Sequence, residues 1–434
     1  MSKFGEFLKS DRNGELEFDG VRITALAAEY GTPLFVLSES TIRHNYRRIH
    51  RAFQDVYPAE VIVCAGMKGN AGLAARRVIV EEGGGGDAFG LGELTVAMMA
   101  GSDPRKIVMN GANKSRETIA AAIDLGVMNQ VDNADELAVV GEVAKEMGRT
   151  ARVSLRIRLP LAALEEIEYV DPRYPDGISP SYWERTFKFG MEPASYVDAV
   201  NAAKRMPGVV LEGMHYHGGI PRRAGFYREE TEDLVEHIAD IKAKTGWAPA
   251  YVNVGGGFVS ERYGADAPPP VEAYGKAISE AIVSTCRKHK IEVPVLMLEP
   301  GRYCWESAGL WITKVGARKE DTTLAKKTWV YVDGNTNEMR DPFDPRCSVH
   351  HVLIANDVKR KGKEVVDVCG QTCNAADILA KARELQPIRT GDILAFMDMG
   401  AYNESFACQS NVIPRSATVM VSKGRSTVVR RRET

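Results

Sequence analysis

Lys68 has the setting of a reactive amine, because it follows the apolar run Val61 to Met67 and precedes Gly69 and Asn70. Such a run is typical of a buried strand, so we expect the lysine at the end of that strand. A desolvated lysine has a lowered pKa and can attack an aldehyde. A solvated lysine at a strand end fits the same position, and the residue alone does not decide between the two.

Three consecutive glycines provide a candidate phosphate site. Gly255, Gly256 and Gly257 follow the expected strand end at 252–254. Without Cβ atoms, successive backbone N–H groups can approach a phosphate closely. A simple tight turn is the alternative for an isolated glycine triplet.

Glu299 closes a further apolar run and is followed by Pro300, Gly301 and Arg302. A carboxylate at the end of a buried strand can keep a pyridine nitrogen protonated, and a protonated ring is the stronger electron sink. An ordinary ion pair between Glu299 and Arg302 is the competing interpretation.

Two other segments carry groups with distinctive chemistry. His215 and His217 flank Tyr216, and strand alternation points both to the same side, where they could bind a metal. We find no third ligand at a convincing position and expect no metal. Cys373, just after an apolar segment, carries a thiol that can deliver a proton to a carbanion, although a buried inert thiol is also possible.

The segments that must position these residues alternate between β-like and helical patterns from Leu34 to Ala308. The expected strands are 61–64, 85–89, 106–109, 127–131, 152–157, 209–214, 251–254 and 294–298. Helical patterns between them include 40–56, 92–100, 115–125, 134–147 and 227–245. Parallel strands with crossover helices follow, enough for a (β/α)8 barrel. A barrel gathers the carboxyl ends of its strands on one face, so we expect one site assembled from many loops.

Beyond residue 308 the pattern changes to β-like segments with few helices, at 310–317, 328–333, 350–357, 364–369, 392–396 and 417–422. These predict a mostly antiparallel β domain, which residues 15–23 are expected to join as an N-terminal strand. We therefore expect a barrel domain over 34–308 and a β domain made from 1–33 and 309–434.

Composition excludes several classes of protein. Lys plus Arg number 56 against 58 for Asp plus Glu, so net charge gives no reason to bind nucleic acid. The sequence contains no secretory signal pattern and no apolar run long enough for a membrane span. Seven cysteines spread along 434 residues predict reduced thiols. We expect a cytoplasmic protein with a small partner.

Taken in order, these segments resemble those of the fold type III pyridoxal-phosphate decarboxylases, and most of all the diaminopimelate decarboxylase family. The resemblance extends over nearly the whole chain. The matching blocks are 68–70, 87–94, 110–115, 188–190, 213–219, 255–257, 299–302, Cys373 with Asp377, and 400–402.

The resemblance implies pyridoxal 5'-phosphate as cofactor, held by Lys68 as a Schiff base. It places Asp87 beside the cofactor, stacks His217 on the pyridine ring and pairs Glu299 with the ring nitrogen. The residues that it places around the phosphate or the substrate carboxylate are Gly255, Gly256, Gly257, Gly301, Arg302 and Tyr402. It also implies a homodimer with shared active sites, in which the block around Cys373 reaches the site of the second subunit.

The implied reaction is the loss of an amino acid's α-carboxylate as carbon dioxide, followed by protonation of the α-carbon at Cys373. Glu299 argues against an amino-acid racemase, because barrel racemases resemble one another in placing arginine at that nitrogen. A non-catalytic pyridoxal-phosphate-binding homologue stays open. So does a metal-dependent barrel hydrolase built on His215 and His217.

The sequence departs from the family where the substrate's tail would bind. Family decarboxylases that act on diaminopimelate or ornithine carry an acid directly after the cysteine, whereas this chain has Asn374. A neutral amide cannot neutralise an ammonium in a desolvated pocket, so we expect an altered tail, bearing a carboxylate or an amide. Arg340 is a candidate to bind a tail carboxylate. Ile220 replaces an expected serine, and 161–183 reads as an inserted loop.

Overall fold

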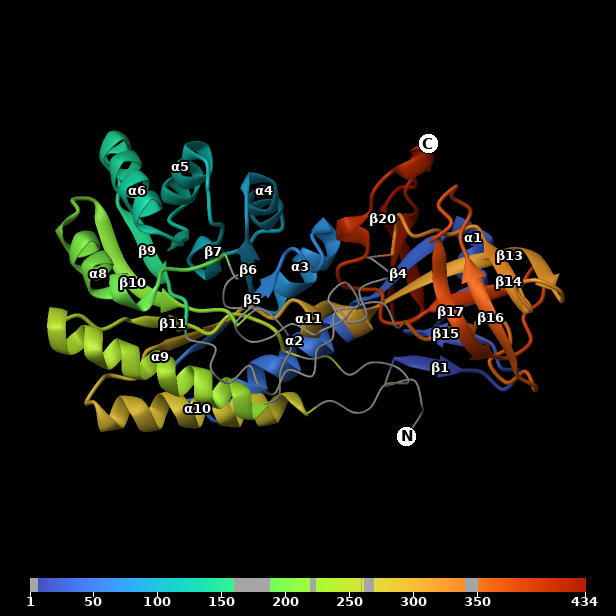
Figure 1. The fold of residues 1–434 in the computed structure, drawn as a ribbon, viewed down its shortest axis with the longest axis horizontal. Helices are drawn as coiled ribbons and strands as arrows, with labels where there is room; N and C mark the ends of the chain where they lie inside the picture. The colour runs from blue at the N-terminus through green and yellow to red at the C-terminus, as the bar shows by residue number, and fades with distance from the viewer. Residues whose placement is uncertain (1–6, 160–187, 219–223, 259, 261–268, 340–349) are drawn as a thin grey trace. The chain divides into compact units, whose positions relative to one another are not determined.

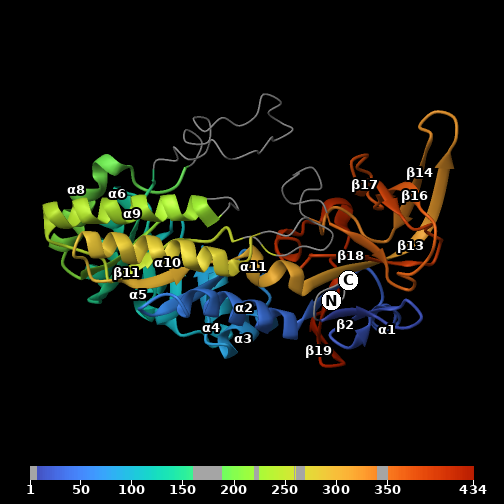
Figure 2. The ribbon, with the colours of Figure 1, turned by 90° about the horizontal axis from the view of Figure 1, so that it is seen from below.

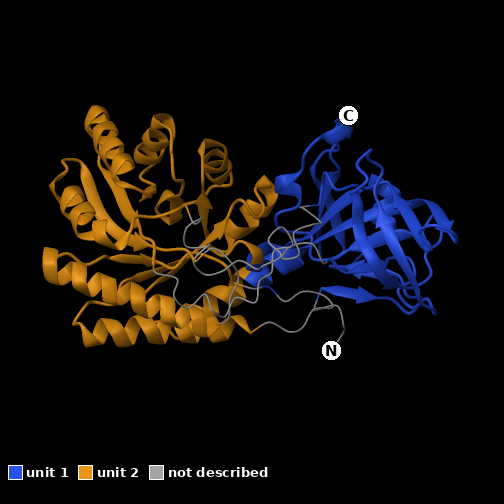
Figure 3. Cartoon of the chain, viewed as in Figure 1, with its two compact units in different colours: residues 1–45, 260–267, 303–434 blue, residues 46–259, 268–302 orange. Residues whose placement is uncertain are grey.

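The structure, a computed structural model, describes residues 7–159, 188–218, 224–258, 260, 269–339 and 350–434. The chain forms two compact units, shown in Figure 3. Unit 1 comprises residues 1–45, 260–267 and 303–434, and unit 2 comprises residues 46–259 and 268–302. Each unit is described by itself below. Among the described residues, no helix has both the length and the apolar composition needed to cross a bilayer.

Unit 2 is a closed barrel of parallel strands wrapped by helices (Figure 1). Its strands are β5 (Val61–Gly66), β6 (Gly85–Ala88), β7 (Ile107–Met109), β8 (Met128–Val131), β9 (Ala151–Arg156), β10 (Val209–His215), β11 (Tyr251–Asn253) and β12 (Val295–Leu298). Each strand pairs with its neighbours in sequence, and β12 closes the barrel on β5. The predicted barrel and its eight strand positions are confirmed.

The helices of the barrel follow the strands in sequence. They are α3 (Leu73–Glu81), α4 (Leu91–Met99), α5 (Arg116–Leu125), α6 (Ala134–Met147), α8 (Tyr196–Arg205), α9 (Ala224–Thr245) and α10 (Val271–Lys288), with α2 (Glu39–Gln54) and the short α11 (Arg302–Trp305) crossing the unit boundaries. Figures 1 and 2 show α9 and α10 running side by side along the barrel.

Local sequence explains where these elements begin and end. Ser115 accepts a hydrogen bond from the Thr118 N–H at the start of α5, and Gly126 ends the helix in the left-handed conformation. Asn133 and Gly148 do the same for α6. Inside the barrel, β-strand side chains pack into an apolar core that includes Ile62, Cys64, Val108, Met128 and Met297.

Unit 1 is built on a mostly antiparallel sheet of nine strands. These are β4 (Leu34–Ser38), β13 (Gly309–Asp321), β14 (Lys327–Val332), β15 (Val352–Ile354), β16 (Glu364–Cys369), β17 (Ile378–Leu385), β18 (Ile393–Phe396), β19 (Ala417–Ser422) and β20 (Arg425–Arg430). A small antiparallel sheet holds β1 (Leu8–Ser10), β2 (Leu16–Phe18) and β3 (Val21–Arg22), and α1 (Ile23–Tyr30) follows it.

The N-terminal strand of the large sheet is β4 and not the segment 15–23. That segment contains Asp19 and Gly20, both with positive φ (48° and 80°), and the turn they form folds it into the hairpin of β2 and β3. β4, which we expected at the start of the barrel domain, pairs with β13 and β19 in unit 1. All residues of β4 are buried, so its sequence is a continuous, mostly apolar run like that of a barrel strand.

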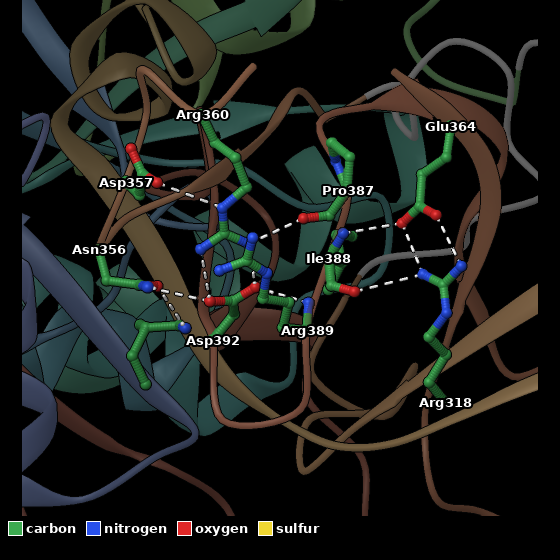
Figure 4. A network of polar contacts seen from close by, with 10 residues as sticks. Arg318, Asn356, Asp357, Arg360, Glu364, Pro387, Ile388, Arg389 and Asp392 are labelled. Carbon is green, nitrogen blue, oxygen red and sulfur yellow. Dashed lines mark hydrogen bonds and ion pairs between the residues drawn. The ribbon is translucent and has the colours of Figure 1, made fainter. Parts of the chain in front are cut away.

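A network of charged groups fixes the loops at one end of this sheet (Figure 4). Arg360 donates to both carboxylate oxygens of Asp392, at 2.6 and 2.9 Å, and to the Pro387 carbonyl at 2.8 Å. Arg318 makes a similar fork with Glu364, at 2.6 and 2.7 Å. Burial opposes the charge of Asp392, but the hydrogen bonds from Arg360 and Asn356 lower the pKa of its carboxyl below the usual value.

Candidate active site

Lys68 and Asp87 form an ion pair at the carboxyl ends of β5 and β6. The Lys68 Nζ lies 3.0 Å from the Asp87 Oδ2 and 5.3 Å from the centre of the Phe89 ring. The lysine side chain is 38% exposed, whereas that of Asp87 is wholly buried. Burial raises the pKa of Asp87, and Glu299 adds to this rise while Lys68 opposes it. The predicted lysine therefore has an accessible amine beside a buried acid.

Glu299, directly after β12, is held by amide side chains from three other strand ends. Its Oε1 accepts from the Nδ2 of Asn253 at 2.7 Å and of Asn110 at 3.0 Å, and from the Nε2 of Gln130 at 3.5 Å. Asn110 also donates to Asp87 Oδ1 at 2.7 Å, which links the two carboxylates. These donors surround a buried carboxylate that faces the inside of the barrel mouth.

The charge on Glu299 is stabilised further by a histidine. His215, at the end of β10, places Nε2 3.6 Å from the Glu299 Oε2. Burial opposes ionisation of Glu299, but His215, His217 and Lys68 lower the pKa of its carboxyl below the usual value. Glu299 is thus a buried anion held by polar side chains.

His217 is half-buried and is bound through its ring to the glycine loop after β11. The Gly256 N–H donates to the His217 Nδ1 at 3.2 Å, so the neutral ring carries its proton on Nε2. The surrounding protein lowers the pKa of His217 well below its usual value, and the charges of Arg156 and Lys68 add to this effect. His217 is therefore a neutral ring with a fixed tautomer.

The glycine loop needs two of its glycines for steric reasons. A Cβ on Gly256 would lie 2.2 Å from the Glu299 carbonyl oxygen, and one on Gly255 would lie 2.6 Å from the His217 Nδ1. Gly255 also has a φ of 69°, in the left-handed region. The loop is held in turn by the Glu299 N–H, which donates to the Gly255 carbonyl at 2.8 Å.

A second cation lies on the far side of the barrel mouth, at the end of β9. Arg156 is buried, and its guanidinium lies 4.4 Å from the centre of the Phe189 ring. Burial lowers the pKa of Arg156, while Glu299, Asp132 and Asp87 oppose this change. The block 188–190 is anchored there because the Gly190 N–H donates to Asp132 at 3.0 Å.

The remaining predicted residues of unit 2 lie near the end of β12. Gly301 packs so closely on β5 that a Cβ on Gly66 would lie 3.2 Å from its Cα, and the Gly66 N–H donates to the Pro300 carbonyl at 3.0 Å. Arg302 is half-buried at the start of α11. The Glu299 Oε1, for which an ion pair with Arg302 was the competing interpretation, accepts from the amides of Asn253, Asn110 and Gln130.

Cys373, Asn374 and Tyr402 lie in unit 1. Cys373 is exposed, its N–H donates to the Asn411 Oδ1 at 3.2 Å, and its Sγ accepts from the Asn411 Nδ2 at 3.3 Å. The Asn374 Oδ1 accepts from the Ala376 N–H at 2.9 Å in a tight local turn. Tyr402 has a φ of 62°, unusual for a residue with a side chain.

Two sequence predictions fall outside the described residues, namely Arg340 and the segment 161–183, as does Ile220. His215 and His217 do not form a metal site with neighbours: within the described ranges, no group of three or more His, Cys, Asp or Glu side chains is arranged to hold a metal ion.

The donor set of the barrel mouth fits pyridoxal 5'-phosphate. It combines an accessible amine, a buried carboxylate suited to a protonated ring nitrogen, a neutral imidazole and a glycine loop. The buried polar atoms without a hydrogen-bond partner in the described part of the barrel include Asn110 Oδ1, Gln130 Oε1 and both ring nitrogens of His215. Fold and site together define a pyridoxal-phosphate-binding barrel enzyme.

Comparison with known proteins places the chain in a family. Residues 40–306 match the family "Pyridoxal-dependent decarboxylase, pyridoxal binding domain", and the chain belongs to it. It is similar to the diaminopimelate decarboxylases of Methanocaldococcus jannaschii, with 34% identity covering 98% of this chain and 94% of the relative, and of Methanothermobacter thermautotrophicus, with 33% identity covering 97% and 94%. The solved structure of the M. jannaschii protein in complex with L-lysine has a TM-score of 0.89 at 32% identity, covering 100% of this chain and 96% of that one. The chain is therefore a pyridoxal-phosphate-dependent amino-acid decarboxylase.

Several residues of the site were not predicted individually. Asn110, Gln130 and Asn253 hold Glu299, and Arg156 lies opposite them. Their common signal is a polar side chain at the carboxyl end of an apolar strand, where a barrel turns side chains into its mouth. That signal was available in the sequence, but it does not say which of these residues meet.

Proposed function

We propose that this protein decarboxylates an α-amino acid whose distal end carries a carboxylate or an amide, and that the barrel mouth of unit 2 is its active site. The single observation behind the substrate class is Asn374, which stands where family members that bind a distal ammonium have an acid. The observation behind the site is the arrangement of Lys68, Asp87, His217 and Glu299 around one barrel mouth.

The residues of the barrel mouth divide the work. Lys68 holds the coenzyme covalently, and Asp87 keeps the lysine amine oriented at 3.0 Å. Glu299, fixed by Asn110 and Asn253, would accept a hydrogen bond from the ring nitrogen, and its negative charge would keep that nitrogen protonated. When bound, pyridoxal 5'-phosphate supplies the electron sink that makes loss of the carboxylate possible.

The neutral ring of His217 offers a flat surface, and the glycine loop beside it offers backbone N–H groups for a phosphate. Gly301, Arg302 and Tyr402 complete the binding of the phosphate or the substrate carboxylate. Cys373, exposed and hydrogen-bonded to Asn411, supplies the proton that replaces the lost carboxylate. In our proposal this block acts across a homodimer, and the protein works in the cytoplasm.

The acid of the block 370–377 is Asp377, and its carboxylate is already bound within the protein. Asp377 is buried and accepts from the Thr372 N–H and the Thr336 N–H, both at 2.8 Å. The Asn374 side chain binds its own loop. An amide or carboxylate tail, with Arg340 as a candidate partner, fits this block better than a cationic tail does.

The second candidate substrate is meso-diaminopimelate, which the names of the relatives favour. The two candidates are separated by measuring carbon dioxide release from a panel that includes meso-diaminopimelate, ornithine, lysine, and amino acids with carboxylate or amide tails. We expect turnover in the last group only. Efficient turnover of meso-diaminopimelate alone refutes the altered tail and leaves the decarboxylase class intact.

Two variants sharpen this test. Asn374→Asp restores the acid of the family pattern and is expected to raise activity on cationic tails. Lys68→Ala is expected to abolish the visible absorption of the purified enzyme, whereas Lys106→Ala, which removes an amine bound to the Gly83 carbonyl in the same barrel, should leave it unchanged. Retained absorption in Lys68→Ala would refute the assignment of the lysine.

A further inference from the structure

The first turns of α9 carry two buried side chains, three residues apart, that bind the loops beside His217. The Tyr227 hydroxyl donates to the Gly256 carbonyl at 2.8 Å, in the glycine loop after β11. The Glu230 Oε2 accepts from the Tyr216 hydroxyl at 2.7 Å, in the loop after β10. Residues three apart lie on the same face of a helix, so one helix face holds both loops.

These two contacts meet at His217. Tyr216 directly precedes His217 in the chain, and Gly256 is the residue whose N–H donates to the His217 Nδ1 at 3.2 Å. Tyr227 thus holds the glycine whose N–H sets the tautomer, while Glu230 holds the side chain of Tyr216, the residue before His217. The aromatic ring of Tyr227 is itself held, stacked on Phe258 with ring centres 5.4 Å apart.

We propose that Tyr227, Glu230 and Tyr216 are positioning residues that hold His217 in one orientation, with its proton on Nε2. The proposal rests on the proposed function in that His217 is taken as part of the coenzyme site. The glycine loop has no side chain at Gly255 or Gly256, because a Cβ at either would collide with His217 or with the Glu299 carbonyl. Hydrogen bonds to its backbone therefore hold it, and the Tyr227 hydroxyl of α9 provides one of them beside the Glu299 N–H.

The test uses the full-length enzyme with its coenzyme and reads the histidine directly. Protein labelled with ¹⁵N-histidine is compared as wild type, Tyr227→Phe and Tyr216→Phe, and the His217 signals are assigned from their loss in His217→Gln. Wild type should show one neutral tautomer, protonated on Nε2. Each phenylalanine variant should shift the tautomer ratio roughly fivefold toward Nδ1–H, the effect of losing about one hydrogen bond.

Tyr57→Phe is the matched control, because the Tyr57 hydroxyl donates to the Pro294 carbonyl at 2.7 Å and is buried at the opposite end of the barrel strands. It should leave the His217 tautomer as in wild type. An unchanged tautomer in both test variants, or an equal shift in Tyr57→Phe, overturns the proposal. If one test variant does not fold, the other decides.

The readout is independent of the reaction. A shifted tautomer in an enzyme that releases no carbon dioxide from any substrate leaves the positioning role standing and refutes the proposed function. An unshifted tautomer in both variants of an active enzyme refutes the positioning role and leaves the proposed function standing.

Discussion

Asn110→Asp tests how the barrel holds two buried acids close together. The Asn110 Nδ2 donates to Asp87 Oδ1 at 2.7 Å and to Glu299 Oε1 at 3.0 Å. A hydrogen bond to a charged group contributes about 1.5–3 kcal/mol, so losing both costs about 3–6 kcal/mol of unfolding free energy. The new carboxylate also adds like charge at the same distances, in a site where all three side chains are buried.

The loss should depend on pH. Neighbouring carboxylates raise the pKa of an aspartate at position 110 above its unfolded value of about 3.9. Such a group destabilises the folded state increasingly as the pH rises from the unfolded pKa through the raised one, so the penalty is largest at pH 8 and smallest near pH 4.

Urea unfolding at several pH values measures this penalty. Asn133→Asp is the matched control, since Asn133 is the N-cap of α6 in the same unit and aspartate serves equally well there. The control should lie within about 0.5 kcal/mol of wild type. If Asn110→Asp is as stable as the control at pH 8, the amide does not hold the two acids together.

Three further changes have defined outcomes. Gly256→Ala should destroy coenzyme binding or folding, because its Cβ would lie 2.2 Å from a backbone carbonyl, while Gly225→Ala, with open space at its Cβ, should keep absorption and stability. Lys114→Met removes the cation that pairs with the buried Glu136, because the Lys114 Nζ lies 2.9 Å from the Glu136 Oε2 and both side chains are at most 5% exposed. Thermal unfolding should show a loss of about 3–5 kcal/mol in unfolding free energy. Asp392→Asn should destabilise the protein at pH values above about 3.9, the unfolded pKa, because it removes the charged partner of Arg360. Wild type itself loses this stabilisation as the pH falls through the lowered pKa of the folded state, so the two proteins should become alike in acid. Identical unfolding curves at all pH values would refute this.

The barrel could be predicted because its signals are local. Each strand is a short apolar run, and the helices carry their own caps, as at Ser115 and Asn133. The sequence placed Leu34–Ser38 in the barrel domain because a central strand of a sheet covered on both faces has the same apolar composition as a barrel strand. The turn at Asp19 and Gly20 was also missed, although its residue types favour a tight hairpin.

The site could be predicted only in part, for a related reason. Lys68, Glu299 and the glycine loop are recognisable from the residues that flank them in sequence. The amides that hold Glu299 come from three other strands, so nothing local indicates that Asn110 and Asn253 share one carboxylate oxygen. The departure at Asn374 was visible in the sequence, but its bond to the Ala376 N–H was not.

The position of β4 has a consequence for synthesis of the chain. Its two partners, β13 and β19, begin at residues 309 and 417, so β4 stays unpaired until the whole barrel has been synthesised and gains its second partner only near the end of the chain. The barrel strands, all between residues 61 and 298, can assemble in the meantime. A stalled chain whose residues up to 302 have left the ribosome exit tunnel should therefore protect its barrel amides from exchange while leaving the β4 amides exchangeable.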